Sequence, residues 1–233
     1  MMKKYLRLPY LPIFLAPLIL FAPVFLTGKA LFWGTSSLQF IPWWDYALDT
    51  LKVGQVPFWN PWVGMGAPLL ANYQSALFYP PHWFYFLLGL LGGTSLMAWG
   101  MALLVSGHLI GAGLGMAALT RALGLKPLPQ TVAGLAFSLS GYLVARAGFL
   151  SINAAVAWLP WILLLALRTT PPKPDPRRII FLGLVLGGQF LAGHAQTAWY
   201  TALLTGTWVV FWSWVRSHGD GLLARVRAMA RGV

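Results

Sequence analysis

Two carboxylates four residues apart are the first candidates for chemistry in this sequence. Asp45 and Asp49 are half of the four acidic residues of the chain, and Lys52 follows them. In a helix, positions i, i+4 and i+7 share one face, so the three charges would project together. Two interpretations stay open: a catalytic pair in which an aspartate acts as a base, or the solvated side of an interfacial helix, with Lys52 partly neutralising Asp49.

Basic and amide side chains supply the second set of candidates. Arg146 lies in an apolar run, where an arginine is costly unless an anion accompanies it. Its planar guanidinium would suit a lipid-linked phosphate, although snorkelling to the headgroups is the alternative. His194 and Gln196 fall between two apolar segments. The histidine could exchange a proton near neutral pH or donate to a phosphate oxygen; the alternative is a turn histidine bonded to backbone carbonyls.

Metal and cofactor chemistry has little support in the sequence. There is no cysteine, which excludes thiolate ligands and disulfides. The aspartate pair with a remote histidine could hold a divalent cation, but no recognised ligand spacing is present, so no cofactor is predicted. His108 stands among glycines in an apolar stretch, and we predict that it forms an interhelical hydrogen bond.

The composition predicts a membrane protein. Hydrophobic residues make up 58% of the 233 residues and charged residues only 9%. A soluble domain of this length would need a charged surface of about a quarter of its residues. The chain is strongly basic, but its lysines and arginines sit between apolar runs, which argues against nucleic acid and for contacts with anionic lipids. We therefore expect an all-α fold, a polytopic transmembrane bundle.

About six spans are predicted from apolar runs close to the 20 residues that cross a bilayer. Thirteen of the sixteen basic residues then fall on one side, which the positive-inside rule assigns to the cytoplasm together with both termini. The predicted location is thus the cytoplasmic membrane, with Lys29, Lys52 and Arg146 outside. The candidate spans are Leu8–Thr27, Leu96–Leu119, Thr131–Phe149, Ile152–Leu167, Ile179–Gly193 and Thr197–Val215.

The first two predicted spans are separated by a long aromatic segment, residues 28–81, on the outer side. Loops of this length are usually functional or disordered, and this one is too aromatic for disorder. Within it, Trp43 to Val53 is predicted to form a short amphipathic helix, with Trp44 and Leu48 on its apolar face. Residues 216–233 form a basic cytoplasmic tail, predicted to be an amphipathic helix, and the linker Thr169–Pro176 is too rich in proline to be helical.

Two stretches of this sequence resemble the YfhO-type bacterial membrane proteins, a family among the GT-C-fold glycosyltransferases. The first is Gln39…Pro42-Trp43, Gly54-x-x-Pro57-x-Trp59-Asn60-Pro61, Gly66-x-Pro68 and Asn72-x-Gln74-Ser75-x-x-x-Tyr79-Pro80. The second is Ala192-Gly193-His194-Ala195-Gln196-Thr197.

The resemblance implies that a sugar passes from a polyprenyl-phosphate carrier to an envelope polymer or lipid on the outer membrane face. In such enzymes an aspartate after the first span acts as a base or orients the acceptor. Here the corresponding stretch carries Thr35, which cannot hold a negative charge at neutral pH. Asp45 and Asp49 are then the nearest candidates for the catalytic role. Substrate binding is expected from Gln39, Trp59, Asn60, Asn72, Gln74, Arg146, His194 and Gln196.

Other functions remain open at this point. The loss of the family aspartate favours a non-catalytic scaffold or accessory protein that binds a lipid-linked saccharide. A small transporter is the third alternative, for which charges in the middle of the spans would be expected. Members of the family are longer, so this chain is expected to be either an N-terminal portion or a shortened relative.

Overall fold

The computed structural model describes residues 9–31, 34–170, 175–218 and 221. In these ranges the chain is helical apart from loops and one two-residue strand pairing, β1 (Trp59–Asn60) with β2 (Ala67–Pro68). The all-α prediction is therefore confirmed. Most of the basic tail predicted over residues 216–233 lies outside the described residues, as do residues 171–174 of the proline-rich linker. The described ends of that linker belong to helices at Thr169 and Pro176.

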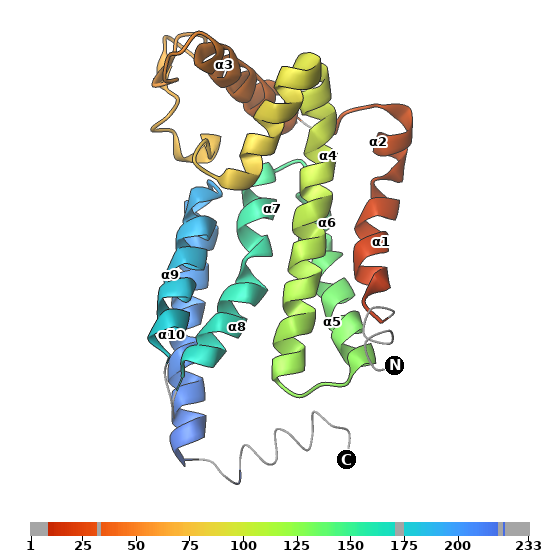
Figure 1. The fold of residues 1–233 in the computed structure, drawn as a ribbon, viewed down its shortest axis with the longest axis vertical. Coiled ribbons are helices and arrows are strands. Elements are labelled where there is room, and N and C mark those ends of the chain that lie inside the picture. The colour runs from red at the N-terminus through yellow and green to blue at the C-terminus, as the bar shows by residue number, and fades with distance from the viewer. Residues whose placement is uncertain (1–8, 32–33, 171–174, 219–220, 222–233) are drawn as a thin grey trace.

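The helices stand roughly side by side as a bundle, with a smaller folded part at one end (Figure 1). Several of the rods consist of two successive helices, because prolines and glycines interrupt them. In chain order the bundle helices are α1 (Leu11–Leu20), α2 (Ala22–Thr27), α4 (Trp83–Ala122), α5 (Pro127–Ser138), α6 (Gly141–Ala145), α7 (Leu150–Ala157), α8 (Leu159–Thr169), α9 (Pro176–Leu191) and α10 (Ala195–His218).

Three stretches are long and apolar enough to cross a membrane within the described ranges: Pro80–Ala122, Pro127–Ala145 and Leu150–Thr169. These candidate spans indicate a membrane protein, and they correct the prediction of about six spans. The first predicted span is broken at Phe21, which leaves α1 with 10 residues. Helix α9 has only 16 residues and opens with two arginines. Helix α10 is 24 residues long but carries many threonines and other polar or weakly hydrophobic residues.

Close helix packing through glycine holds one side of the bundle together. A Cβ on Gly134 of α5 would lie 2.7 Å from the carbonyl oxygen of Gly113 in α4, and Ile13 of α1 fills the space beside both glycines. Ile13 is fully buried. Such contacts between small residues are the usual way in which helices approach each other in lipid, where no hydrophobic effect drives their association.

Helix α4 contains a sharp break that the sequence did not reveal. Gly92 and Gly93 leave helical geometry, and Gly93 adopts a φ of 68°, which favours glycine. The segment Trp83–Leu91 therefore forms a separate helical arm that meets the long remainder of α4 at the top of Figure 1.

Residues 34–82, which we term the cap, fold over one end of the bundle (Figure 1). The cap contains the π-helix Ser36–Phe40, α3 (Ile41–Lys52), the β1–β2 hairpin and two short 3-10 helices, Tyr73–Ser75 and Pro80–His82. The predicted amphipathic helix is confirmed as α3, which buries Trp44, Ala47 and Leu48 and exposes Asp49. The prediction that this segment is folded rather than disordered is confirmed as well.

The core of the cap is built around Trp44. Its side chain is 1% exposed, its ring stacks on Tyr85 of the α4 arm with centroids 4.3 Å apart, and its Nε1 donates to the carbonyl oxygen of Ser75 at 2.8 Å. One side chain thus joins α3, the α4 arm and the 3-10 helix Tyr73–Ser75. Such a large buried aromatic ring stabilises a domain by several kcal/mol, about 3–5 by the usual cost of its truncation.

The connections that carry basic residues lie at the opposite end of the bundle. Arg121 is in the last turn of α4 and Arg168 in the last turn of α8, and Figure 1 shows both helix ends, together with the start of α9, far from the cap. The cap and these connections would therefore face opposite sides of a membrane that surrounds the bundle.

Candidate functional site

The two stretches that carry the family resemblance lie in contact, although more than a hundred residues separate them in the sequence. Gly193, in the turn between α9 and α10, sits directly under the 3-10 helix Tyr73–Ser75. A Cβ built on it would be 3.0 Å from the carbonyl oxygen of Tyr73 and 3.3 Å from that of Gln74. Gly193 also has a φ of 88°, a conformation that favours glycine. The turn that presents His194 and Gln196 is therefore packed against the cap.

Arg146 and His194 come together at this same end. Arg146 follows the last residue of α6, and its guanidinium lies over the rings of Tyr142 at 5.0 Å and Phe149 at 5.8 Å. Burial, followed by the positive charge of Arg146, lowers the pKa of His194 below its usual value. Among the described residues Arg146 forms no ion pair with a carboxylate. The two basic side chains therefore lie near enough to interact electrostatically, and no described carboxylate neutralises Arg146, so this end of the protein favours an anion.

An apolar groove of about 240 Å³ leads away from these two residues. We term it the lateral groove; its walls include Val156 and Leu159 on one side and Leu204 of α10 on the other. Two of its lining residues touch the basic pair: Tyr142 stacks under Arg146, and Thr197 Oγ1 is 2.7 Å from His194 Nδ1. Neither Arg146 nor His194 lines the groove itself, but each contacts one of the residues that do.

Position 35 is where the family aspartate was expected. The residue that follows it contacts the chain segment just after Arg146. Ser36 Oγ, one residue further on, donates to the carbonyl oxygen of Gly148 at 2.9 Å. Thr35 is half-buried. Thr35 is therefore adjacent to a residue that contacts the segment after Arg146, and its hydroxyl adds no negative charge there.

Four of the predicted amide side chains are placed in or next to this site. Gln39 Nε2 donates to Gln74 Oε1 at 3.2 Å, which links the π-helix to the 3-10 helix above Gly193. Asn72 Oδ1 accepts from the backbone nitrogen of Gln74 at 3.1 Å and begins that 3-10 helix. Gln196 Nε2 donates to the hydroxyl of Tyr200, which lines the lateral groove. Asn72 therefore has a turn-forming role in the structure.

The other predicted site residues lie elsewhere in the cap. Trp59 packs its indole onto Gly66 of the hairpin turn, where a Cβ would come within 2.6 Å of Trp59 Nε1. Asp45 accepts a hydrogen bond from Thr94 Oγ1 at 2.6 Å, and Asp49 pairs with Lys52 at 2.9 Å. Asp45 and Asp49 share with Asn60 a separate cleft of about 380 Å³. No contact joins either carboxylate to Arg146 or His194 among the described residues.

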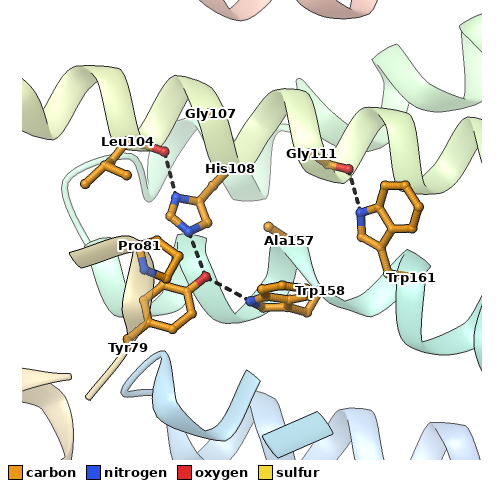
Figure 2. A pocket seen from close by; sticks show the side chains of 9 residues that line it. All are labelled: Tyr79, Pro81, Leu104, Gly107, His108, Gly111, Ala157, Trp158 and Trp161. Carbon is orange, nitrogen blue, oxygen red and sulfur yellow. Dashed lines mark hydrogen bonds between the residues drawn. The ribbon is translucent and has the colours of Figure 1, made fainter. Parts of the chain in front are cut away.

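A hydrogen-bonded chain of three aromatic side chains was missed by sequence reasoning (Figure 2). Trp158 Nε1 donates to the Tyr79 hydroxyl at 2.9 Å, and that hydroxyl is 2.9 Å from His108 Nε2. His108 Nδ1 is 2.6 Å from the carbonyl oxygen of Leu104, which can only accept, so Nδ1 carries the proton and the tyrosine donates to Nε2. The interhelical hydrogen bond expected of His108 is not formed directly: its partners are Leu104 of its own helix and Tyr79 of the cap, and Tyr79 makes the contact to Trp158.

This chain borders an apolar pocket of about 260 Å³ between α4 and the α7–α8 rod, lined also by Gly107, Gly111 and Trp161. Because each polar group of the chain already has a partner, the pocket offers a ligand no free hydrogen bond. The hydrogen-bonded chain therefore serves to attach Tyr79 of the cap to the helices of the bundle.

A metal centre finds no support in the part of the chain that the structure describes. No group of three or more histidine and acidic side chains lies close enough there to hold an ion. The carboxylates of Asp45 and Asp49 remain the only described pair of acidic residues that line one cleft.

Comparison with known proteins gives no relative. No protein-family model, curated protein or solved structure matches this chain. The resemblance to the YfhO-type family therefore stays a prediction from the motifs.

Proposed function

We propose that this protein is a GT-C-like membrane glycosyltransferase, or the N-terminal portion of one, that binds a polyprenyl-phosphate-linked sugar in the lateral groove. The polyprenyl chain would lie in the groove, and its phosphate would sit between Arg146 and His194. The sugar would then reach the cap and pass to an envelope polymer or lipid on the outer face of the cytoplasmic membrane. In this proposal the cap faces outward and the basic connections face the cytoplasm.

One observation supports this proposal: Arg146 and His194, without a described carboxylate partner, each contact a residue that lines the apolar groove. A lipid phosphate is the ligand that satisfies both parts. Its chain gains from leaving water for an apolar wall, and its phosphate would accept hydrogen bonds from the Arg146 guanidinium and the His194 imidazole. Arg146 is held by Tyr142, so its planar fork is already oriented for bidentate contact with phosphate oxygens.

Removal of the guanidinium should separate phosphate binding from chain binding. We expect Arg146→Gln to weaken binding of a polyprenyl phosphate by about tenfold or more, since a charge-assisted hydrogen bond contributes roughly 1.5–3 kcal/mol. Binding of the polyprenol of the same length should not change. The measurement is calorimetric titration of the purified protein in lipid nanodiscs.

Arg121→Gln is the matched control for this experiment. Arg121 is exposed in the last turn of α4, at the end of the bundle opposite the cap (Figure 1). It should bind the phosphate as the wild-type protein does. Equal affinity of Arg146→Gln and the wild-type protein for the phosphate would remove the basis of the proposal.

The affinity for a polyprenyl-phosphoryl sugar should depend on pH through His194. Burial and Arg146 lower the pKa of this histidine in the free protein, so it is neutral near pH 7. A bound phosphodiester keeps one negative charge and raises that pKa, so protonation and binding are linked. We therefore expect several-fold tighter binding at about pH 5.5 than at about pH 8. His194→Gln should abolish this dependence; a profile that remains equally steep would assign it to another group.

A non-catalytic relative that binds a lipid-linked saccharide is the second candidate. It is favoured by the lack of a described carboxylate contact to Arg146 or His194 and by Thr35 in place of the family aspartate. For this candidate the wild-type protein should show no sugar transfer, and Thr35→Asp should gain it. Thr35→Asn, which has the same shape without the charge, is the control. Transfer by the wild-type protein from a labelled polyprenyl-phosphoryl sugar would exclude the second candidate.

A further inference from the structure

We infer that the cap contains a binding cleft for a neutral saccharide, separate from the lateral groove. The cleft has a volume of about 380 Å³ and lies between α3 and the turn that follows β1. Its lining is mixed: the rings of Trp43, Tyr46 and Trp62, two carboxylates and one amide. We term it the cap cleft.

The carboxylates of the cap cleft keep part of their hydrogen-bonding capacity. Asp45 Oδ1 accepts from Thr94 Oγ1 at 2.6 Å, and Asp49 Oδ1 accepts from Lys52 Nζ at 2.9 Å. Across the described ranges of the chain, the second oxygen of each carboxylate has no hydrogen-bond donor. Each oxygen can therefore accept from a ligand hydroxyl, with the strength of a charge-assisted hydrogen bond.

Asn60 provides an independent indication of a ligand. Its side chain is only 3% exposed, and its Oδ1 accepts from the backbone nitrogen of Trp62 at 2.9 Å, which fixes the orientation of the amide. No described residue accepts a hydrogen bond from its Nδ2. Asn60 Nδ2 is not one of the fully buried side-chain atoms that lack a partner, so it is accessible from the cleft that Asn60 lines. It is therefore free to donate to an acceptor oxygen of a ligand.

Trp62 supplies an aromatic surface at the entrance. Its side chain is 81% exposed, although burial of a tryptophan ring would be worth several kcal/mol, about 3–5 by the effect of truncation. The short β1–β2 pairing holds the turn that carries it next to α3. An exposed ring beside unsatisfied polar groups is typical of a ligand site with a few placed polar contacts.

The side chains that line the cap cleft favour one class of ligand over the others. An anion is disfavoured by two carboxylates, and an apolar chain would leave those carboxylates and Asn60 without partners. An organic cation would satisfy the carboxylates and the aromatic rings, but it has no acceptor for Asn60 Nδ2. The hydroxyls of a sugar both donate and accept, and the C–H faces of its ring can pack on Trp62. A neutral saccharide therefore fits all three parts.

The saccharide would be the acceptor of the proposed sugar transfer, and only this role rests on the proposed function. The two carboxylates would then hold the acceptor hydroxyls rather than the lipid phosphate. Binding itself depends on the cap cleft alone.

The experiment is a titration of the full-length protein in nanodiscs with neutral oligosaccharides of glucose, N-acetylglucosamine and galactose, followed by tryptophan fluorescence. We expect saturable binding of at least one of them. Trp62→Ala and Asn60→Asp should each weaken it by about tenfold, the second because it removes the Nδ2 donor and keeps the shape. Asp175→Asn, at the start of α9, should leave binding unchanged.

Asn60→Asp also distinguishes the ligands. It weakens a saccharide but strengthens a cation, because it adds a negative charge; tetramethylammonium and Ca²⁺ are the probes for this outcome. No saturable binding of any oligosaccharide in the panel, saturable binding of tetramethylammonium or Ca²⁺ by the wild-type protein in its place, or a Trp62→Ala effect confined to adsorption on lipid vesicles would each overturn the inference. If Arg146→Gln leaves polyprenyl phosphate binding intact while the saccharide still binds, the proposed function fails and the cap cleft stands.

Discussion

Gly193→Ala is expected to lower the stability of the protein by at least about 1–2 kcal/mol, the cost of holding an L-residue in the left-handed region. The φ of Gly193 is 88°, and the new methyl group would also meet the carbonyl oxygen of Tyr73 and the Cβ of Ala76, both at 3.0 Å. Backbone atoms cannot rotate aside as a flexible side chain can. The cap must therefore move away from the α9–α10 turn.

The same substitution should weaken the binding of polyprenyl phosphate by about tenfold or more, because His194 is the next residue and its position depends on this contact. The measurements are thermal unfolding in nanodiscs, where a loss of several degrees is expected, and the calorimetric titration described above. Gly187→Ala is the control, since a Cβ on Gly187 within α9 meets nothing within 4 Å. A Gly193→Ala protein with unchanged stability and affinity would show that the turn and the cap are not packed together.

Trp44→Ala is expected to have the largest effect on stability, about 3–5 kcal/mol. The substitution removes a ring that is 1% exposed, its stacking on Tyr85 and the hydrogen bond to the Ser75 carbonyl oxygen. Because these contacts join three parts of the cap, we expect the cap to open before the bundle unfolds. Limited proteolysis of the protein in nanodiscs should then cleave within residues 34–82 first.

Two further variants separate packing from hydrogen bonding at this position. Trp44→Phe keeps most of the ring contact and should cost about 1–3 kcal/mol, the penalty for an unsatisfied buried acceptor. Trp62→Ala, at an 81% exposed position, should leave stability within about 0.5 kcal/mol of the wild type. If Trp44→Ala destabilised the protein no more than Trp62→Ala, the cap would not have the core described here.

The membrane class and the presence of α3 could be predicted from the sequence because both depend on local pattern. Apolar composition and length decide whether a helix suits lipid. The sequence spacing places Trp44 and Leu48 on one face of a helix and Asp49 on the other. The number of spans could not be predicted equally well. Composition alone does not show that α1 ends at Leu20 or that α4 breaks at Gly92 and Gly93.

The candidate site was predicted in its residues but not in its grouping. Motif resemblance selected Gln74 and His194, while their proximity depends on Gly193 fitting under the cap. The separation of Asp45 and Asp49 from Arg146 could not be read from the sequence either, because it depends on which side of α3 faces the bundle. Tyr79 and Trp158 carried no chemical signal, since an aromatic residue near a membrane surface is usually an anchor.

Photocrosslinking is the most direct test of a polyprenyl phosphate site between Arg146 and His194. A polyprenyl phosphate with a photoreactive group near the phosphate would be bound to the protein in nanodiscs, irradiated, and its adducts located by mass spectrometry. We predict adducts within residues 142–159 and 194–204, which include Arg146, His194 and the walls of the lateral groove, and their loss in Arg146→Gln. Adducts confined to other parts of the chain, or equal labelling by the unphosphorylated polyprenol, would contradict a phosphate site between Arg146 and His194.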